Sequence, residues 1–223
     1  MSTVPDGGPT PPPVFGVLLT NLGSPTAPSA PALREYLREF LADRRVVDLP
    51  RFRWWLIRNL CVVPLRPRKS AALYRRIWTA VGSPLTVTTR RIGDALEARL
   101  SDTGGPGVPL EVAMRYGSPS IKSGMAALTG RGCSRILVLP LYPQYSTTTT
   151  ASTEDAFATA LSVMEPAPEI RTVQDYHDHP AYLTALQSVV REFWDEHGPP
   201  NRFLMSFHGI PRRYATAGDP YPK

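Results

Sequence analysis

Among the 223 residues of this chain, His208 is the strongest candidate for a chemical role, because of its side chain and its position in the sequence. It follows an apolar run at residues 203–207 and precedes Gly209 and Pro211, so we expect it at the exit of a strand. Histidine has an ordinary pKa of about 6.5, accepts a proton near neutral pH and binds metal ions through its ring nitrogens. The sequence therefore predicts a metal-binding or proton-transfer role for His208.

Other polar and aromatic side chains follow apolar runs of the same kind. They are Asn21, Arg115, Tyr116, Tyr142, Tyr176 and His177. If the runs are parallel strands, their carboxyl ends share one edge of a sheet, which is where α/β proteins bind ligands. A pocket built from these groups is aromatic and polar with few carboxylates, which suits a flat, apolar molecule with anionic substituents.

The elements that must position these residues alternate along the chain. Short runs rich in β-branched and aromatic residues predict strands at about 14–20, 111–115, 135–141, 170–175 and 203–207. Apolar residues at helical spacing predict helices at about 30–41, 86–100, 121–129, 153–164 and 180–197. This alternation predicts an α/β fold with a parallel sheet flanked by helices.

Several classes of protein are disfavoured by what the sequence lacks. No GxGxxG motif follows the first strand and no GxxxxGK[ST] motif occurs, which argues against a dehydrogenase or an NTPase. No apolar run reaches the length of about 18 residues typical of a membrane-spanning helix. Residues 1–13 lack the apolar centre of a signal peptide, so we predict a disordered tail on a cytoplasmic protein. Cys61 and Cys133 are too far apart for a CxxC metal site, and we predict two buried thiols.

Positive charge is concentrated in one segment. Residues 34–76 hold twelve Lys or Arg against four acidic residues, a net charge of +8, whereas the whole chain carries +6. This segment predicts attraction for an anion, namely small-molecule carboxylates, lipid headgroups or phosphates. Nucleic acid is not expected as a partner, because no helix-turn-helix, zinc-finger or RRM signature accompanies the charge. Residues 51–58 (RFRWWLIR) are basic, aromatic and amphipathic, and we predict that they make reversible contact with anionic membranes.

Five segments resemble the motifs of the ferrochelatases and occur in the order found in that family. They are VLLTNLGSP at 17–25, YRRI with GSPL at 74–85, MRYG at 114–117, LYPQYS at 141–146, and SFHGIP with GDPYP at 206–222. The resemblance implies a fold of two Rossmann-like lobes with a porphyrin held between them. Residues 14–176 then form the first lobe, and residues 177–223 form a connecting helix and the opening strand of an incomplete second lobe.

The resemblance also implies an activity, which is the insertion of Fe(II) into protoporphyrin IX to give protoheme in heme biosynthesis. His208 takes the catalytic position, as proton acceptor, metal ligand or both. The positions that match porphyrin-binding residues of the family are Leu22, Arg45, Ser83, Arg115, Tyr116 and Tyr142. Leu22 favours protoporphyrin over coproporphyrin. No tightly bound cofactor is expected: iron is a substrate, and Thr147 stands where animal members carry a cluster-binding cysteine.

Part of the family pattern has no counterpart in these residues. In the family an acidic residue of the second lobe faces the histidine, and no residue here matches it. We therefore expect this chain to be a C-terminally truncated family member. By itself it should insert little or no metal, which an assay of iron or zinc insertion into protoporphyrin checks.

Other interpretations stay open. Arg115 and Tyr116 also fit an ordinary ion pair and a core tyrosine, and Leu22 and Tyr142 fit simple packing. A cobalt or nickel tetrapyrrole chelatase is the rival enzyme, favoured by the extra histidines His177 and His179. A non-catalytic tetrapyrrole-binding protein is the rival from another class.

Overall fold

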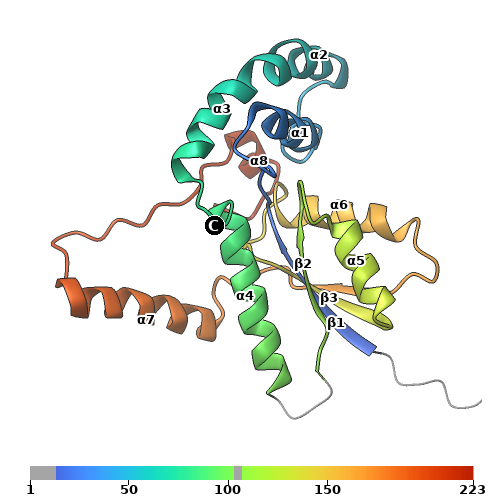
Figure 1. Ribbon diagram of the computed structural model, residues 1–223. Coiled ribbons are helices and arrows are strands. Elements are labelled where there is room, and N and C mark those ends of the chain that lie inside the picture. Colours follow the sequence, from blue (N-terminus) through green and yellow to red (C-terminus); the bar gives the residue numbers. More distant parts are fainter. Residues whose placement is uncertain (1–13, 103–106, 223) are drawn as a thin grey trace, which may run out of the picture.

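The computed structural model describes residues 14–102 and 107–222, in which strands and helices alternate (Figure 1). The tail predicted at residues 1–13 lies outside the described residues. The strands are β1 (Val14–Asn21), β2 (Leu110–Met114), β3 (Cys133–Pro140) and β4 (Glu169–Thr172). The helices are α1 (Ala30–Phe40), α2 (Arg51–Leu56), the π-helical segment η1 (Ile57–Val62), α3 (Val63–Ile77), α4 (Pro84–Ser101), α5 (Ile121–Gly130), α6 (Thr150–Leu161), α7 (Pro180–His197) and α8 (Arg212–Thr216).

The four strands form one parallel sheet in the order β2-β1-β3-β4. β1 is central, and its Leu19 is paired with Val112 on one side and Leu139 on the other. The run Val17-Leu18-Leu19 is buried on both faces, as expected for a strand inside a parallel sheet. The predicted α/β class with a parallel sheet flanked by helices is confirmed.

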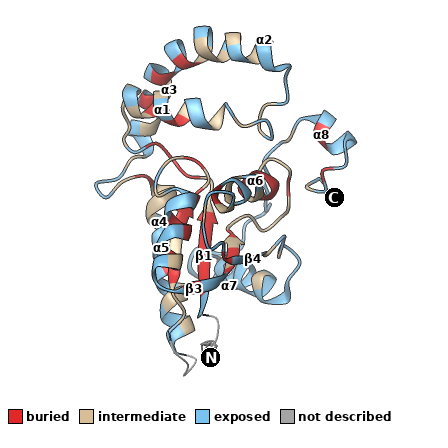
Figure 2. Cartoon of the chain, turned by 90° about the vertical axis from the view of Figure 1, so that its right-hand side faces the viewer, coloured by how far each residue is buried: buried red, intermediate tan, exposed pale blue. Residues whose placement is uncertain are grey.

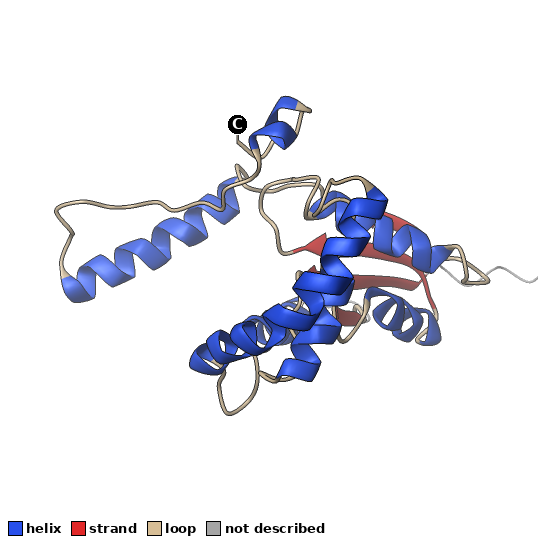
Figure 3. Cartoon of the chain, turned by 90° about the horizontal axis from the view of Figure 1, so that it is seen from above, coloured by secondary structure: helices blue, strands red, loops and turns tan. Residues whose placement is uncertain are grey.

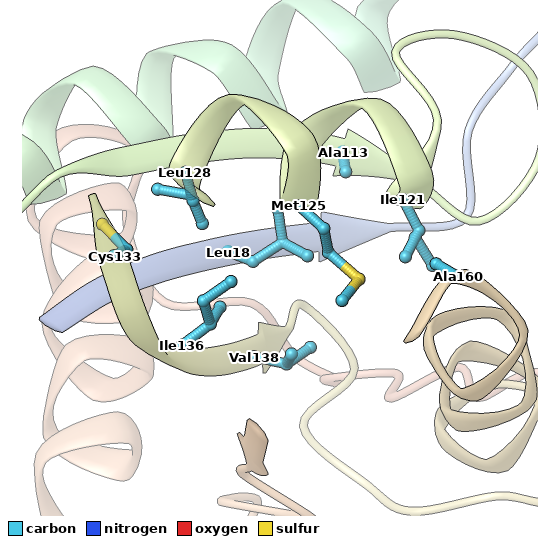
Figure 4. Packing of buried hydrophobic residues seen from close by; sticks show 9 residues of the cluster. All are labelled: Leu18, Ala113, Ile121, Met125, Leu128, Cys133, Ile136, Val138 and Ala160. Atoms are coloured by element: carbon cyan, nitrogen blue, oxygen red, sulfur yellow. The ribbon is translucent and has the colours of Figure 1, made fainter. Parts of the chain in front are cut away.

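Two helical layers cover the two faces of the sheet. On one face Leu18, Ile136 and Val138 pack against Met125 of α5 and Ala160 of α6 (Figure 4). On the other face the neighbouring side chains of β1 pack against α4, through the residues Val17, Leu19, Leu110, Leu96 and Leu100. Because alternate residues of β1 point to opposite faces, a single strand anchors both layers.

Gly124 on α5 lets this helix lie close to β1. A Cβ atom there would stand 2.7 Å from Leu18 Cδ1 and 3.2 Å from Ala113 Cβ. We expect Gly124→Ala to lower the free energy of unfolding by about 1–3 kcal/mol, the usual cost of overpacking a core. Gly130→Ala in the same helix is the control, because nothing lies within 4 Å of its added methyl group. Urea denaturation followed by circular dichroism compares them, and equal effects would contradict the close packing.

A third helical layer, formed by α1, α2, η1 and α3, lies beyond the carboxyl ends of the strands (Figures 1 and 2). Ser29 precedes α1 as its N-cap, as the sequence predicts. The long helical stretch from 51 to 77 was not predicted, because Pro64 and Pro67 within it ordinarily interrupt helices. Pro64 stands in the first turn of α3, where its missing N–H is tolerated, whereas Pro67 lies inside α3 and is buried. No helix within the described ranges combines the length and the hydrophobicity needed to cross a membrane.

The two cysteines differ in their surroundings. Cys133 is buried beneath α5, as predicted. Cys61 is exposed, so the prediction of two buried thiols is wrong for this residue. It lies on η1, whose residues are at least partly exposed.

The C-terminal part departs from the prediction. The helix predicted at 180–197 is α7, with the same bounds. Residues 203–207, predicted as a fifth strand, have no regular secondary structure, and Leu204 is 90% exposed. A strand forms only beside a neighbour that accepts its backbone hydrogen bonds, and this segment runs back along α7 instead of along the sheet (Figure 3). His208 therefore follows an unpaired extended segment, and the division into lobes at 176/177 stays a prediction.

Candidate functional site

A cavity of about 430 Å³ opens at the carboxyl ends of β1 and β3. Its other wall is the segment at 208–211 together with Tyr214 of α8 and Tyr221. Leu22, Tyr142 and His208, three of the predicted site residues, line it together. The remaining apolar and aromatic lining comes from Phe40, Val46, Leu141, Ile210 and Pro211. Such a surface suits a flat apolar molecule.

The sheet holds one side of this cavity in place. Leu22 directly follows β1, and its carbonyl accepts a hydrogen bond from the Tyr116 N–H at 3.0 Å. Tyr142 follows β3, and the preceding Leu141 N–H donates to the Thr20 carbonyl at 2.8 Å. Both side chains therefore start from hydrogen-bonded backbone at the carboxyl edge of the sheet.

Tyr142 presents its ring to the cavity and buries its hydroxyl. Among the described residues, no group stands in good hydrogen-bond geometry to that hydroxyl, although the Thr153 side chain is near enough to lower its pKa slightly. Burial raises the pKa of the Tyr142 hydroxyl, so the phenol is neutral. The ring, not the hydroxyl, is the part of Tyr142 that a ligand in the cavity would meet.

His208 lies on the opposite side. Its backbone N–H donates to Tyr221 Oη at 3.1 Å. His208 is exposed where it lines the cavity, and its imidazole forms no hydrogen bond with any described residue. It is thus available to accept a proton or to bind a metal ion.

Asp43, between α1 and α2, is a hydrogen-bonding centre that the sequence did not reveal. Its Oδ2 accepts hydrogen bonds from Arg115 Nη2 at 2.6 Å, Tyr116 Oη at 2.7 Å and Ser152 Oγ at 2.5 Å. Burial alone would raise the pKa of the Asp43 carboxyl, but the hydrogen bonds from Ser152 and Tyr116, the Arg45 N–H and the charge of Arg115 together hold it below its ordinary value. Asp43 is therefore ionised at neutral pH and joins three parts of the fold.

Arg115 and Tyr116 both form hydrogen bonds with Asp43. Tyr116 is fully buried, and Arg115 forms a largely buried ion pair with Asp43. Burial raises the pKa of the Tyr116 hydroxyl, with a smaller contribution from the Asp43 charge. Their predicted contact with a porphyrin stays a prediction, because both are engaged with Asp43.

The two remaining predicted residues lie apart. Arg45 forms an exposed ion pair with Asp155, with Nε and Oδ2 separated by 2.7 Å. Ser83 precedes α4 and lines a separate hollow of about 270 Å³ with Ser24, Thr86 and Arg90. The fold thus brings three of the seven predicted residues into one cavity, and the roles of the others are untested.

The extra histidines lie at the start of α7. His179 Nδ1 accepts a hydrogen bond from the Ala181 N–H at 3.2 Å and so caps this helix. His177 stands beside Asp175 and Asp178, with one ligand atom of each within 4.8 Å of the others, and all three are exposed. Exposed acidic groups commonly cluster without a metal, so this group does not favour the cobalt or nickel enzyme.

Comparison with known proteins supports the motif-based interpretation. The family model for ferrochelatase matches residues 14–223. The chain belongs to the ferrochelatase family. It is 52% identical over 210 residues to the ferrochelatase of Thioalkalivibrio sulfidiphilus, a match that covers 94% of this chain and 57% of the relative. It is 51% identical over 206 residues to the ferrochelatase of Aromatoleum aromaticum, covering 92% and 56% of the two chains.

A third relative gives the same result. The ferrochelatase of Pectobacterium atrosepticum is 47% identical over 209 residues, covering 94% of this chain and 64% of that protein. The chain therefore spans less than two thirds of the length of the curated ferrochelatases that it matches. Family membership confirms the resemblance read from the five motifs, while the residue roles implied by it are proposals.

Proposed function

We propose that this chain holds protoporphyrin IX and accepts its pyrrole protons in an enzyme that inserts Fe(II) to form protoheme, a lyase reaction of heme biosynthesis. The observation that carries the proposal is the shared cavity of Leu22, Tyr142 and His208. Family membership supplies the reaction class. The mainly apolar lining supports an apolar macrocycle as the ligand.

The reaction replaces two pyrrole N–H protons by one Fe(II), so charge balances when both protons leave the macrocycle. A group beside the ring must accept them one at a time and pass each to solvent, and a neutral imidazole can do so near neutral pH, whereas lysine and arginine already carry a proton. His208 faces the cavity with an unbonded imidazole and fits this role. Metal ligation by the same ring nitrogen remains part of the proposal, as an alternative or an additional step.

The porphyrin carboxylates are expected to meet the basic segment at 34–76. Arg45 is the best candidate, because it can leave its ion pair with Asp155 with little loss of stability. An exposed pair of this kind contributes only about 0–1 kcal/mol to the free energy of unfolding. Arg115 is less available, since its pair with Asp43 is largely buried. We therefore propose Arg45 as a direct partner of a carboxylate, and Arg115 as a partner only if its pair with Asp43 opens.

Protoporphyrin binding tests the cavity directly. We expect Tyr142→Ala to weaken binding of protoporphyrin IX by about 10-fold or more, because a buried aromatic contact of about 1.5–3 kcal/mol is lost. Tyr142→Phe is the matched control and should bind within about 3-fold of the unmodified chain, because the hydroxyl is buried and makes no well-aligned hydrogen bond among the described residues. Fluorescence titration measures both. Unchanged porphyrin binding by Tyr142→Ala would show that the porphyrin lies elsewhere. Porphyrin binding without metal insertion, in every form of the protein tested, would favour a non-catalytic tetrapyrrole-binding protein.

We also propose that α2 and the residues after it dock on anionic membranes. Phe52 is 74% exposed, Trp55 54% and Leu60 65%, and the basic residues Arg51, Arg53 and Arg58 alternate with them. Exposed aromatic and apolar side chains among cations are typical of segments that bind at a lipid surface. Trp54 is different, because its Nε1 donates to the Leu41 carbonyl at 2.6 Å and holds α2 to the end of α1.

Sedimentation with phosphatidylglycerol vesicles tests this docking. We expect the double variant Phe52→Ser/Trp55→Ser to lower the bound fraction at least about 5-fold, since both exposed aromatic anchors are lost. Phe193→Ser on α7 is the control, because Phe193 is similarly exposed at 58% but belongs to another surface. Equal binding by all three proteins would reject the membrane contact.

A further inference from the structure

Asp219 is a buried carboxylate whose partners in the described part of the chain are all uncharged. It is 4% exposed, and its Oδ2 accepts hydrogen bonds from Ser146 Oγ at 2.9 Å, Thr147 N at 2.8 Å and Thr147 Oγ1 at 2.7 Å. Burial alone would raise the pKa of this carboxyl, but the hydrogen bonds from Thr147, Tyr221 and Ser146 lower it overall. A carboxylate kept charged by this many donors is unusual outside a structural or functional centre.

These hydrogen bonds join two distant segments of the chain. Ser146 and Thr147 belong to the loop between β3 and α6, which also carries Tyr142, whereas Asp219 belongs to the turn after α8. Asp219 Oδ1 also accepts the Tyr221 N–H at 3.0 Å, and Tyr221 Oη in turn accepts the His208 N–H at 3.1 Å. A continuous path of hydrogen bonds therefore runs from the loop of Tyr142 to the backbone of His208.

Little else fixes the segment that carries His208. Residues 203–207 are exposed and unpaired, and every residue of α7 is at least partly exposed. One other tether exists at α8, where Tyr214 Oη donates to the Val46 carbonyl at 3.2 Å and accepts the Asp48 N–H at 3.3 Å. The Tyr214 tether also holds the two ends of α8, because the Tyr214 N–H donates to the Pro211 carbonyl at 2.8 Å and the Asp219 N–H donates to the Tyr214 carbonyl at 3.0 Å. Within the described residues, the hydrogen bond to His208 itself comes from Tyr221, whose backbone is held by the Asp219 carboxylate.

We propose that Asp219 is a positioning residue for His208, because its carboxylate ties the His208 segment to the loop of Tyr142 and thereby sets where the imidazole stands in the cavity. The inference rests on the proposed function only for the role of His208 as the reacting group. In enzymes a displacement of about 1 Å can cost about 100-fold in rate, so such a tether matters for chemistry as well as for folding.

Backbone order at His208 is the quantity that tests the proposal. In the ¹⁵N-labelled chain, with no porphyrin added, the order parameter of His208 is expected near about 0.85 and should fall below about 0.6 in Asp219→Asn, which puts an amide donor opposite the donors of Ser146 and Thr147. The order parameters of α4 and α5 should not change. If Asp219 served only global stability, the folded Asp219→Asn variant would keep His208 as ordered as α4 and α5.

Two further variants make the result decisive. Asp195→Asn on α7 is the control, because Asp195 is exposed and lies outside this network. If Asp219→Asn does not fold, the double variant Ser146→Ala/Thr147→Val removes two of the donors and is expected to loosen His208 in the same way. An ordered His208 in the folded variants, or equal loosening in Asp195→Asn, would overturn the proposal. Because no porphyrin is present, a failure of the proposed function would show separately, as a chain that does not bind protoporphyrin.

Discussion

Replacing Asp43 with alanine is expected to lower the free energy of unfolding by about 3–5 kcal/mol, the usual cost of removing one partner of a buried ion pair. The side chains of Arg115 and Asp43 are 16% and 7% exposed. The change would leave the Arg115 guanidinium without its counter-ion and the hydroxyls of Tyr116 and Ser152 without their acceptor. Chemical denaturation at pH 7, followed by circular dichroism, measures the effect.

The exposed pair Arg45–Asp155 provides the matched control. Its side chains are 41% and 52% exposed, so Asp155→Ala should cost less than about 1 kcal/mol. The double variant Asp43→Ala/Arg115→Met should be more stable than Asp43→Ala alone, because it removes the unpaired charge. Similar losses for Asp43→Ala and Asp155→Ala would mean that Asp43 does not join the parts of the fold.

Replacing His208 with alanine is expected to reduce Fe(II) insertion into protoporphyrin IX by about 10²–10⁴-fold, the usual contribution of a general base. The reason is that the imidazole faces the cavity and is the candidate acceptor for the pyrrole protons. Because the chain spans 57% of the Thioalkalivibrio sulfidiphilus ferrochelatase, the assay uses a chimera of this chain with the part of that relative that the match leaves uncovered. Anaerobic absorption spectroscopy follows heme formation.

His179→Ala is the control for this experiment. His179 caps α7 and is exposed, so its loss should leave iron insertion within about 3-fold of the unmodified chimera. A comparable loss for both variants would contradict a specific role for His208. Cobalt insertion that exceeds iron insertion and depends on His177 would instead support the rival chelatase.

Regular elements with a clear apolar period could be predicted from the sequence, and elements that depend on distant partners could not. The four strands of the sheet lie where the apolar runs predict them, and α7 has the predicted bounds. Residues 203–207 have the same local composition as a strand, but no described strand lies beside them to pair with. The helices at 51–77 were missed because Pro64 and Pro67 ordinarily interrupt helices, and only Val63, Pro67 and Ala71 of α3 are buried to mark an inner face.

The residues of the candidate site also divide into those that the sequence predicts and those that it does not. Leu22, Tyr142 and His208 come directly from motifs, and the fold places them in one cavity. Asp43 and Asp219 are equally central, but each is a single acidic residue in a loop, and the donors to their Oδ2 atoms lie more than 70 residues away in the sequence. No local pattern distinguishes such an aspartate from a solvated one, so only the three-dimensional arrangement reveals it.

The two walls of the cavity are held in different ways, which matters for anyone who wants to alter what it accepts. Leu22 and Tyr142 extend directly from hydrogen-bonded backbone at the sheet edge, whereas residues 208–211 are held from outside the sheet, through Tyr221 and Tyr214. Substitutions at Ile210 or Pro211 would therefore reshape the binding space without disturbing the sheet. Redesign for bulkier or smaller macrocycles should begin at residues 208–211, and the sheet side should be kept as the fixed template.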